Sequence, residues 1–221
     1  MANRILRASA LLLITLGFGI PALAGNRNGI TTSKDKRQTF ASPSSRSVAG
    51  PDLTNVKFIY NNISRNETGR YNCCTGYTIS GPDSPIGQTY ADAMPFTPAV
   101  NDTIRKILVA VGYVTGTNGV TVSINEDAGG LPGNALETFD KAGLQQFGSC
   151  CIVETVDARI PVAAGTQYWV VVATSVDTSD TWDAWNLNVT DQTSQPFAFF
   201  NNGVWEPTSG ILAAFAVLGE Q

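Results

Sequence analysis

Apolar and polar residues alternate along most of the chain beyond residue 51, and the clearest alternation covers residues 119–125. Three apolar residues there, Val120, Val122 and Ile124, are separated by polar ones, which predicts a strand with one buried face. The Asn-Gly pair at 118–119 predicts a tight hairpin turn before this strand, since both positions of such a turn favour positive φ. The glycine-rich run that follows the strand predicts a turn out of the sheet.

Two segments, 103–114 and 168–172, carry apolar residues on both faces, which predicts central strands that are buried on both sides. Shorter strand-like segments surround them, and none shows a convincing helical period. These segments cover residues 56–60, 71–80, 91–96, 136–139, 151–160, 181–189, 196–200, 204–205 and 212–218. About ten short strands in this order predict an all-β fold, a two-sheet antiparallel sandwich that is jelly-roll-like.

The first 24 residues have the pattern of a secretory signal peptide. Two arginines precede an apolar run over residues 8–20, and Ala22 and Ala24 form a small-residue cleavage site. We therefore expect cleavage between Ala24 and Gly25, and a secreted or periplasmic mature protein. No later apolar run is long enough to cross a bilayer, so no transmembrane helix is expected after cleavage.

Residues 25–50 are rich in Ser, Thr, Asn, Lys and Arg and predict a disordered basic linker, whereas residues 51–221 predict a single β-sandwich domain. The net charge of −4 is divided unequally, because the linker holds five basic residues and one acidic residue, and the domain holds seven basic and seventeen acidic residues. An acidic domain repels nucleic acid and anionic membranes, so we expect neither as a partner. The chain has no histidine, which excludes Ser-His-Asp and Cys-His catalysis and every metal site that uses histidine.

Four cysteines form two adjacent pairs: Cys73 with Cys74, and Cys150 with Cys151. In an exported chain they predict disulfides, and three connectivities are possible. A cross-link between the pairs would close a loop of about 77 residues and stabilise the fold by roughly 4 kcal/mol. Bonds within the adjacent pairs require strained eight-membered rings and are the least favoured arrangement. A zinc site with four thiolates is a further alternative, disfavoured because adjacent cysteines cannot easily chelate one tetrahedral ion.

Two groups of acidic and amide residues are candidates for a calcium site. The first group ends the alternating strand and precedes the glycine-rich loop: Asn125, Glu126 and Asp127. The second group lies farther along the chain: Asp177, Asp180 and Asp183. Oxygen ligands on a glycine-rich loop suit Ca²⁺, but the spacing does not match the twelve-residue calcium loop. We therefore expect solvated loop carboxylates and no cofactor, with a structural Ca²⁺ at residues 125–127 as the alternative.

Tryptophans provide the candidate ligand-binding surface. Trp169 lies in an apolar strand and is expected in the core, whereas Trp182 and Trp185 lie three residues apart in a polar strand and face opposite sides. One of these two should therefore be exposed or lie at an edge. Trp205 follows an Asn-Asn-Gly turn. An exposed tryptophan on a sandwich can stack on a sugar ring, so Trp182, Trp185 and Trp205 are the candidate ligand-binding residues of a carbohydrate-binding module.

Six short motifs follow one another within residues 72–219. They are Asn72-Cys-Cys-Thr-Gly-Tyr-Thr-Ile-Ser, Ala93-Met-Pro-Phe-Thr-Pro, Ser123-Ile-Asn-Glu-Asp-Ala-Gly-Gly-Leu-Pro-Gly, Phe147-Gly-Ser-Cys-Cys, Ala164-Gly-Thr-Gln-Tyr-Trp and Trp185-Asn-Leu-Asn. Together they resemble the bacterial exported domains called choice-of-anchor R. The resemblance implies an exported β-sandwich that precedes a C-terminal anchor, and it implies no enzymatic role. No anchor helix or sorting motif is recognisable after Leu218.

The sequence therefore predicts an exported, non-enzymatic β-sandwich that serves as a structural or adhesive module of the cell envelope or the extracellular space. Polysaccharide or other envelope components are the expected partners. A carbohydrate-binding module is the alternative function. A glycoside hydrolase is a weaker one, because it requires two carboxylates held across a cleft, which sequence spacing does not reveal.

Overall fold

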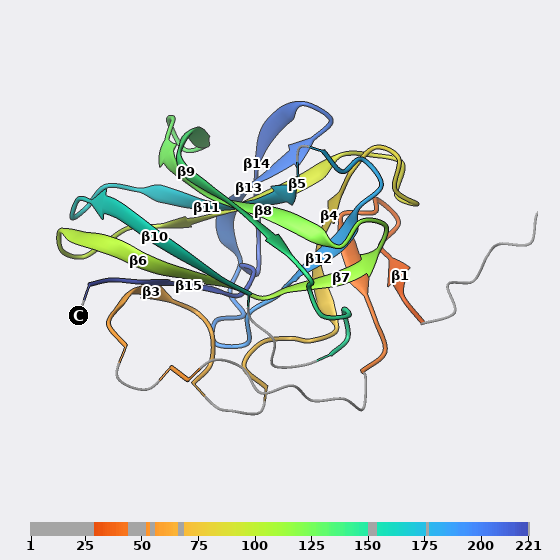
Figure 1. Ribbon diagram of the computed structural model, residues 1–221, viewed down its shortest axis with the longest axis horizontal. Helices are drawn as coiled ribbons and strands as arrows, with labels where there is room; N and C mark the ends of the chain where they lie inside the picture. Colours follow the sequence, from red (N-terminus) through yellow and green to blue (C-terminus); the bar gives the residue numbers. More distant parts are fainter. Residues whose placement is uncertain are drawn as a thin grey trace, which may run out of the picture.

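The computed structural model describes residues 29–43, 52–53, 56–65, 69–149, 154–175 and 177–220. Every regular element over these ranges is a β-strand, and the strands pair antiparallel in two sheets, called sheet A and sheet B here (Figure 1). The predicted all-β fold with two antiparallel sheets is therefore confirmed. The twelve strand-like segments of the sequence become fifteen strands among the described residues, because one predicted strand is divided and the predicted linker contributes two.

Sheet A is the larger sheet, and it branches. Its continuous path contains, in spatial order, β1 (Thr31–Thr32), β2 (Gln38–Phe40), β4 (Thr75–Ser80), β5 (Tyr90–Phe96), β11 (Tyr168–Thr174), β8 (Gly119–Asp127) and β9 (Pro132–Ala142). The strands attached to this path are β7 (Val111–Thr115), β12 (Trp182–Asn186), β13 (Gln195–Asn201) and β14 (Val204–Gly210). β12 pairs with β4 and β7, and β13 pairs with β5 and β14.

Sheet B contains four strands in the order β10 (Glu154–Val162), β6 (Asp102–Val109), β15 (Phe215–Leu218) and β3 (Phe58–Asn61). The inward faces of the two sheets enclose one large apolar core. Met94, Val122 and Val170 enter it from sheet A, and Ile107 and Phe215 enter it from sheet B; all five are fully buried. The alternation predicted around Val122 therefore marks a true core face. None of the described residues belongs to a helix long and apolar enough to span a membrane.

The chain passes from sheet B to sheet A at Ala110. β6 lies between β10 and β15 in sheet B, whereas β7 pairs with β12 in sheet A. The sequence predicts a single strand over residues 103–114, buried on both faces. The same apolar run forms two strands instead, because each half contributes to the shared core from a different sheet.

The predicted hairpin turn at residues 118–119 is wrong. β7 and β8 do not pair with each other, and the positive φ of this loop occurs at Gly116. The Asn118 side chain instead bonds the Leu144 backbone, where its Oδ1 accepts from the N–H at 2.7 Å and its Nδ2 donates to the carbonyl at 2.9 Å. Asn118 therefore fastens the loop after β9 to the sheet, a role that the Asn-Gly pattern does not reveal.

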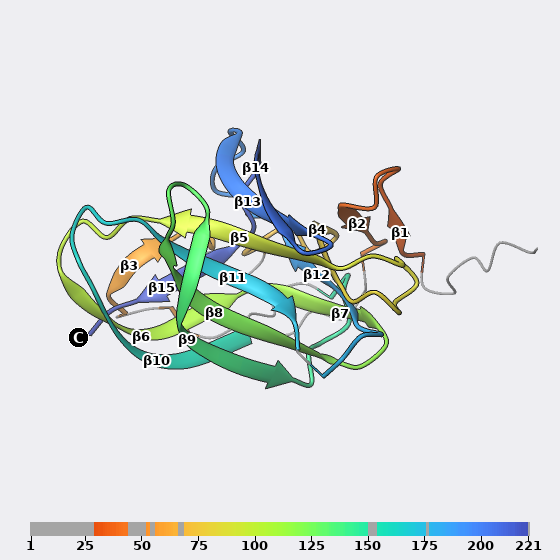
Figure 2. The ribbon, with the colours of Figure 1, turned by 90° about the horizontal axis from the view of Figure 1, so that it is seen from above.

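The prediction of a disordered linker over residues 25–50 is also wrong for residues 29–43. β1 pairs with β2, and β2 pairs with β4, so this hairpin extends sheet A (Figure 2). Thr39 is fully buried, and its hydroxyl is hydrogen-bonded to that of Thr78 at 2.9 Å. Backbone pairing, polar contacts and the buried Ile30 side chain hold the hairpin. A prediction from composition misses it because the segment contains few apolar residues. The predicted signal peptide, with Ala24 and Gly25, lies outside the described residues.

Candidate functional site

Sheet A divides at β5, because two strands approach the same edge of it. Ser80 of β4 pairs with Tyr90, and β13 pairs with residues 90–93, while β11 occupies the opposite edge of β5. β4 and β13 therefore diverge from β5. The β1–β2 and β13–β14 hairpins project from the same side of the molecule at this division (Figure 2).

A pocket of about 320 Å³ lies at this division, and we call it the fork pocket. It is lined by Asp35, Arg37, Gln38, Tyr77, Asp92, Leu187, Phe197, Phe199, Thr208, Ser209, Gly210 and Ile211. The β1–β2 hairpin, β4, β5, β13 and β14 all contribute to its wall. Its volume is near the lower end of the range typical of small-molecule sites, roughly 300 to 1,000 Å³.

Asp92 supplies a buried carboxyl group to the fork pocket. Asp92 is 2 % exposed, and no hydrogen bond from the described part of the chain reaches its carboxyl oxygens. Burial raises the pKa of Asp92 well above 3.8, and the nearby positive charge of Arg37 opposes this effect only in part. Buried polar groups in folded proteins are normally paired, so an unpaired carboxyl that lines a pocket is a candidate for ligand binding.

Aromatic rings form the walls beside this carboxyl. The rings of Tyr77 and Phe197 lie 4.8 Å apart between centroids, and the Tyr77 hydroxyl donates to the Ile211 carbonyl at 2.8 Å. Burial, and then the charge of Asp92, raises the pKa of Tyr77, so this phenol stays neutral. Gly210 leaves room for the arrangement, because a Cβ there would lie 2.6 Å from the Tyr77 hydroxyl oxygen.

The β1–β2 hairpin carries the charged rim of the pocket. The Arg37 guanidinium lies over the Phe199 ring, 3.9 Å from its centroid, and forms an ion pair of 3.7 Å with Glu206 of β14. The Arg37 carbonyl accepts from the Thr78 N–H at 2.9 Å, which holds the rim against β4. The Asp35 carboxylate accepts from the Ser33 hydroxyl, and this hydrogen bond is the main cause that lowers the pKa of Asp35.

Two of the three tryptophans expected to bind a ligand are buried. The Trp182 indole N–H donates to the Thr39 hydroxyl at 3.1 Å, and Trp185 has no exposed surface and packs edge-on against Phe215. The expectation that one of this pair is exposed is therefore wrong. The opposite sides of β12 are covered by different elements, the inter-sheet core on one side and the β1–β2 hairpin on the other.

Trp205 is half-buried. It covers part of the face of sheet A that points away from the core. Its ring contacts Phe200 in an edge-to-face arrangement at 5.3 Å, and it packs on a small cluster that includes Ala93 and Ala198. Trp169, expected in the core, is buried, but in this small cluster and not in the core between the sheets. The structure does not bring Trp205 to Trp182 or Trp185 as one binding surface.

The side chains of the candidate calcium group point to separate partners. Asn125 is bonded to Ser123 and Gly133, and Glu126 accepts from Asn134. The third member, Asp127, accepts hydrogen bonds from the backbone N–H groups of Gly129 and Gly130 and from the side chains of Gln167 and Trp169. These bonds, led by that of Trp169, outweigh burial and lower the pKa of Asp127. A bound Ca²⁺ would have to displace these donors.

The second acidic group is dispersed as well. Asp177 and Asp180 are exposed, and the Asp180 carboxylate accepts from the Thr117 N–H at 3.2 Å. Asp183 is fully buried in β12, and no hydrogen bond from the described residues reaches either of its carboxyl oxygens. Burial raises the pKa of Asp183 to about 8. No group of three potential metal ligands occurs among the described residues.

Cys73 and Cys74 form a disulfide with each other. This is the pairing that the sequence analysis ranks last, and it replaces the expected cross-link for these two residues. The pair lies in a turn immediately before β4, where the backbone is not extended, so the two side chains are not forced to opposite faces. The Gly148 N–H donates to the Cys73 carbonyl at 3.2 Å. Cys150 and Cys151 lie outside the described residues.

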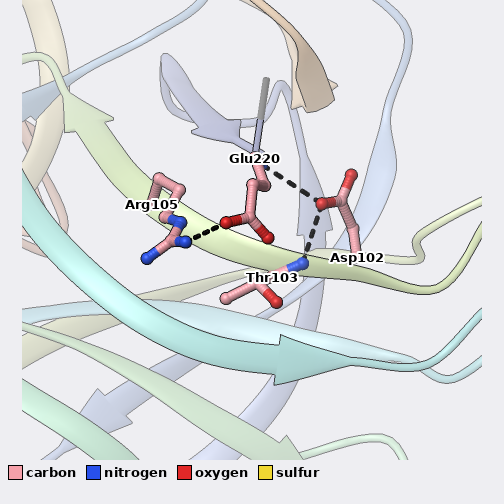
Figure 3. Close-up of polar contacts among 4 residues, drawn as sticks. All are labelled: Asp102, Thr103, Arg105 and Glu220. Carbon is pink, nitrogen blue, oxygen red and sulfur yellow. Dashed lines mark hydrogen bonds and ion pairs between the residues drawn. The ribbon is translucent and has the colours of Figure 1, made fainter.

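A network of charged groups lies where the described chain ends beside β6 (Figure 3). Asp102 accepts from the backbone N–H groups of Thr103 and Glu220 at 2.7 and 3.2 Å, and it forms an ion pair of 2.9 Å with Lys57. Arg105 pairs with the Glu220 carboxylate. Lys57, Asp102, Arg105 and Glu220 are all ion-paired, so the network attaches the last described residues to sheet B.

Asp92 is absent from the residues predicted to form a site, although the sequence contains a signal for it. Asp92 has the same strand parity as Met94 and Phe96, both of which are buried, so the alternation places a lone carboxyl on the core face of β5. An acid at a core position is rare unless it is paired. Comparisons of the chain with known protein families, with curated proteins and with solved structures find no match.

Proposed function

We propose that this protein is an exported, non-enzymatic adhesive module that binds a saccharide of an extracellular or envelope polysaccharide in the fork pocket. The observation that carries the proposal is the unpaired, buried carboxyl of Asp92 at an aromatic-lined pocket. This replaces Trp182 and Trp185 as the binding residues of the carbohydrate-binding alternative, because neither of them lines the pocket.

The composition of the pocket wall supports a sugar as the ligand. Aromatic rings of Tyr77, Phe197 and Phe199 present apolar surface for the C–H face of a sugar ring. Gln38 and Ser209 place hydrogen-bonding side chains beside these rings. A mainly apolar concave site with a few polar groups is the usual form of a small-molecule site.

The arrangement of carboxyl groups supports binding without hydrolysis. A glycoside hydrolase holds two carboxyls on either side of the scissile bond, roughly 5 to 9.5 Å apart. Asp92 is the buried acid of this pocket, whereas the Asp35 carboxylate is committed to its own turn, where it accepts from Ser33 and from the Arg37 N–H at 3.3 Å. One carboxyl is enough to orient a ligand but not to hydrolyse it by this mechanism.

A polysaccharide-binding screen with the full chain tests the proposal, with Ca²⁺ present and absent. A Ser209→Trp variant should lose binding, since it places a bulky side chain at the exposed rim of the pocket. Ser194→Trp is the matched control, because Ser194 is exposed in the loop before β13 and does not line the pocket. Equal binding by both variants would place the ligand elsewhere, and the absence of any binding would favour a purely structural role.

Export is tested separately by mass spectrometry of the mature protein. The mature chain should begin at Gly25, after removal of the signal sequence. A mature protein that retains Met1 would contradict the export part of the proposal.

A further inference from the structure

We propose that the fork pocket selects saccharides that carry a free amino group, whose ammonium is held by the Asp92 carboxylate against the rings of Tyr77, Phe197 and Phe199. This inference rests on the proposed saccharide-binding function and specifies its substrate class.

The Asp92 carboxyl lacks a hydrogen-bond partner among the described residues. A buried carboxylate is stable only when a cation or several hydrogen-bond donors compensate for its lost hydration. The described part of the chain supplies no hydrogen bond to the carboxyl oxygens of Asp92, and the Arg37 guanidinium is engaged with Phe199 and Glu206. A ligand ammonium has three N–H donors and a positive charge, and it would supply what the protein leaves out.

The aromatic rings of the pocket wall also favour a cation. The face of an aromatic ring carries negative potential, and it attracts a cation within about 6 Å of the centroid. Phe199 already holds the Arg37 guanidinium in this way on one side of the pocket. A neutral hydroxyl would use the carboxyl but not this property of the walls, so the combination of rings and buried acid favours an ammonium over a hydroxyl.

The charges at the pocket and over the domain also favour a cationic ligand. The described lining residues include two acids, Asp35 and Asp92, and one base, Arg37, whose charge is paired with Glu206 outside the lining. The residues beyond position 50 are acidic as a whole, with seventeen acidic and seven basic residues. A cationic ligand is therefore attracted at long range and an anionic one repelled.

Calorimetric titration of the full chain with three tetrasaccharides of the same β-1,4 linkage tests the inference. The probes are the glucosamine tetramer with free amines, its fully N-acetylated counterpart, and the glucose tetramer. The free-amine probe should bind at least tenfold more tightly than the other two. Asp92→Asn keeps the size of the side chain and should remove this preference, because the amide has no charge to hold the ammonium.

Two further variants separate the local effect from overall charge and from folding. Asp157→Asn removes one negative charge from an exposed position on β10, outside the fork pocket, and should keep the preference. Phe199→Leu retains the carboxyl but removes a ring, and it should weaken the free-amine probe more than the neutral ones. This variant keeps the test available should Asp92→Asn not fold.

The outcomes distinguish the inference from the proposed function. Equal binding of amine and neutral probes to the wild type would overturn the amine selectivity while leaving saccharide binding in place. A preference that persists in Asp92→Asn would also overturn it, because the selectivity would then come from net charge. Failure of all three probes, together with a negative polysaccharide screen, would refute both.

Discussion

Replacement of Asp183 by asparagine should change how the stability of this protein depends on pH. Burial raises the pKa of this carboxyl to about 8 in the folded protein, while its ordinary value in an exposed chain is 3.8. Between these values the unfolded chain releases the proton and the folded protein retains it, so rising pH favours unfolding. Below this window both states are protonated, and above it both are ionised, so the dependence is confined to the window.

The size of this pH effect follows from the difference between the folded and unfolded pKa values of Asp183. They differ by about four pH units, and each unit corresponds to about 1.4 kcal/mol, so the folded protein should lose roughly 5 kcal/mol of stability between pH 4 and pH 8 through this group. That is a large part of the 5 to 15 kcal/mol or so by which domains are usually stable. Asparagine does not ionise. The free energy of unfolding of Asp183→Asn, relative to that of the wild type, should therefore rise by this amount as the pH increases across the window.

Urea unfolding of the full chain under non-reducing conditions, repeated from pH 4 to pH 9, measures the difference. Other carboxyl groups titrate in both proteins, and their contributions cancel when the two free energies of unfolding are subtracted. Asp180→Asn is the control, since Asp180 is exposed and its pKa is lowered by hydrogen bonds to Thr117. A difference between the wild type and Asp183→Asn that stays within about 1 kcal/mol from pH 5 to pH 8 would refute the reasoning.

Three further predictions concern the loop after β8 and the cysteines. Thermal melts in millimolar Ca²⁺ and in chelator should overlay, because the Asp127 carboxylate already accepts hydrogen bonds from N–H groups. A shift in melting temperature that Asp127→Asn abolishes would establish the calcium site instead. Gly130→Val should lower the free energy of unfolding by about 1 kcal/mol or more, because Gly130 has a φ of +90°; unchanged urea unfolding would contradict this. Non-reducing peptide mapping should find Cys73 bonded to Cys74, and a peptide that joins either to Cys150 would restore the cross-link.

The fold class is predictable here because strand periodicity reports directly on burial. Val122 and its alternating neighbours enter the core as their spacing predicts. Periodicity states that a face is buried but not which element covers it. It therefore cannot distinguish one long strand over residues 103–114 from two strands in different sheets, since both fill the same core.

The candidate site is much less predictable, for two physical reasons. The burial of Trp182 depends on Thr39, which lies 143 positions earlier in a segment whose composition resembles that of a disordered chain. The carboxyls of Asp92 and Asp183 are read as solvated when polarity alone is considered, yet both are buried in strands. Long-range pairing and unfavourable burial are properties of the assembled fold, so local patterns record neither.

The position of β15 has a consequence for the order in which the chain can fold. β15 lies inside sheet B, where Phe215 pairs with Val109 of β6 and Ala216 pairs with Asn61 of β3. Sheet B therefore cannot close until this late strand is available, and the Phe215 ring, which stacks on Tyr60 at 4.5 Å, fills the core only at that stage. Folding that depends on contacts so distant in sequence is slow. In a nascent chain sheet B would stay open until β15 has been synthesised, a state that suits threading through a membrane channel if the protein is exported as proposed.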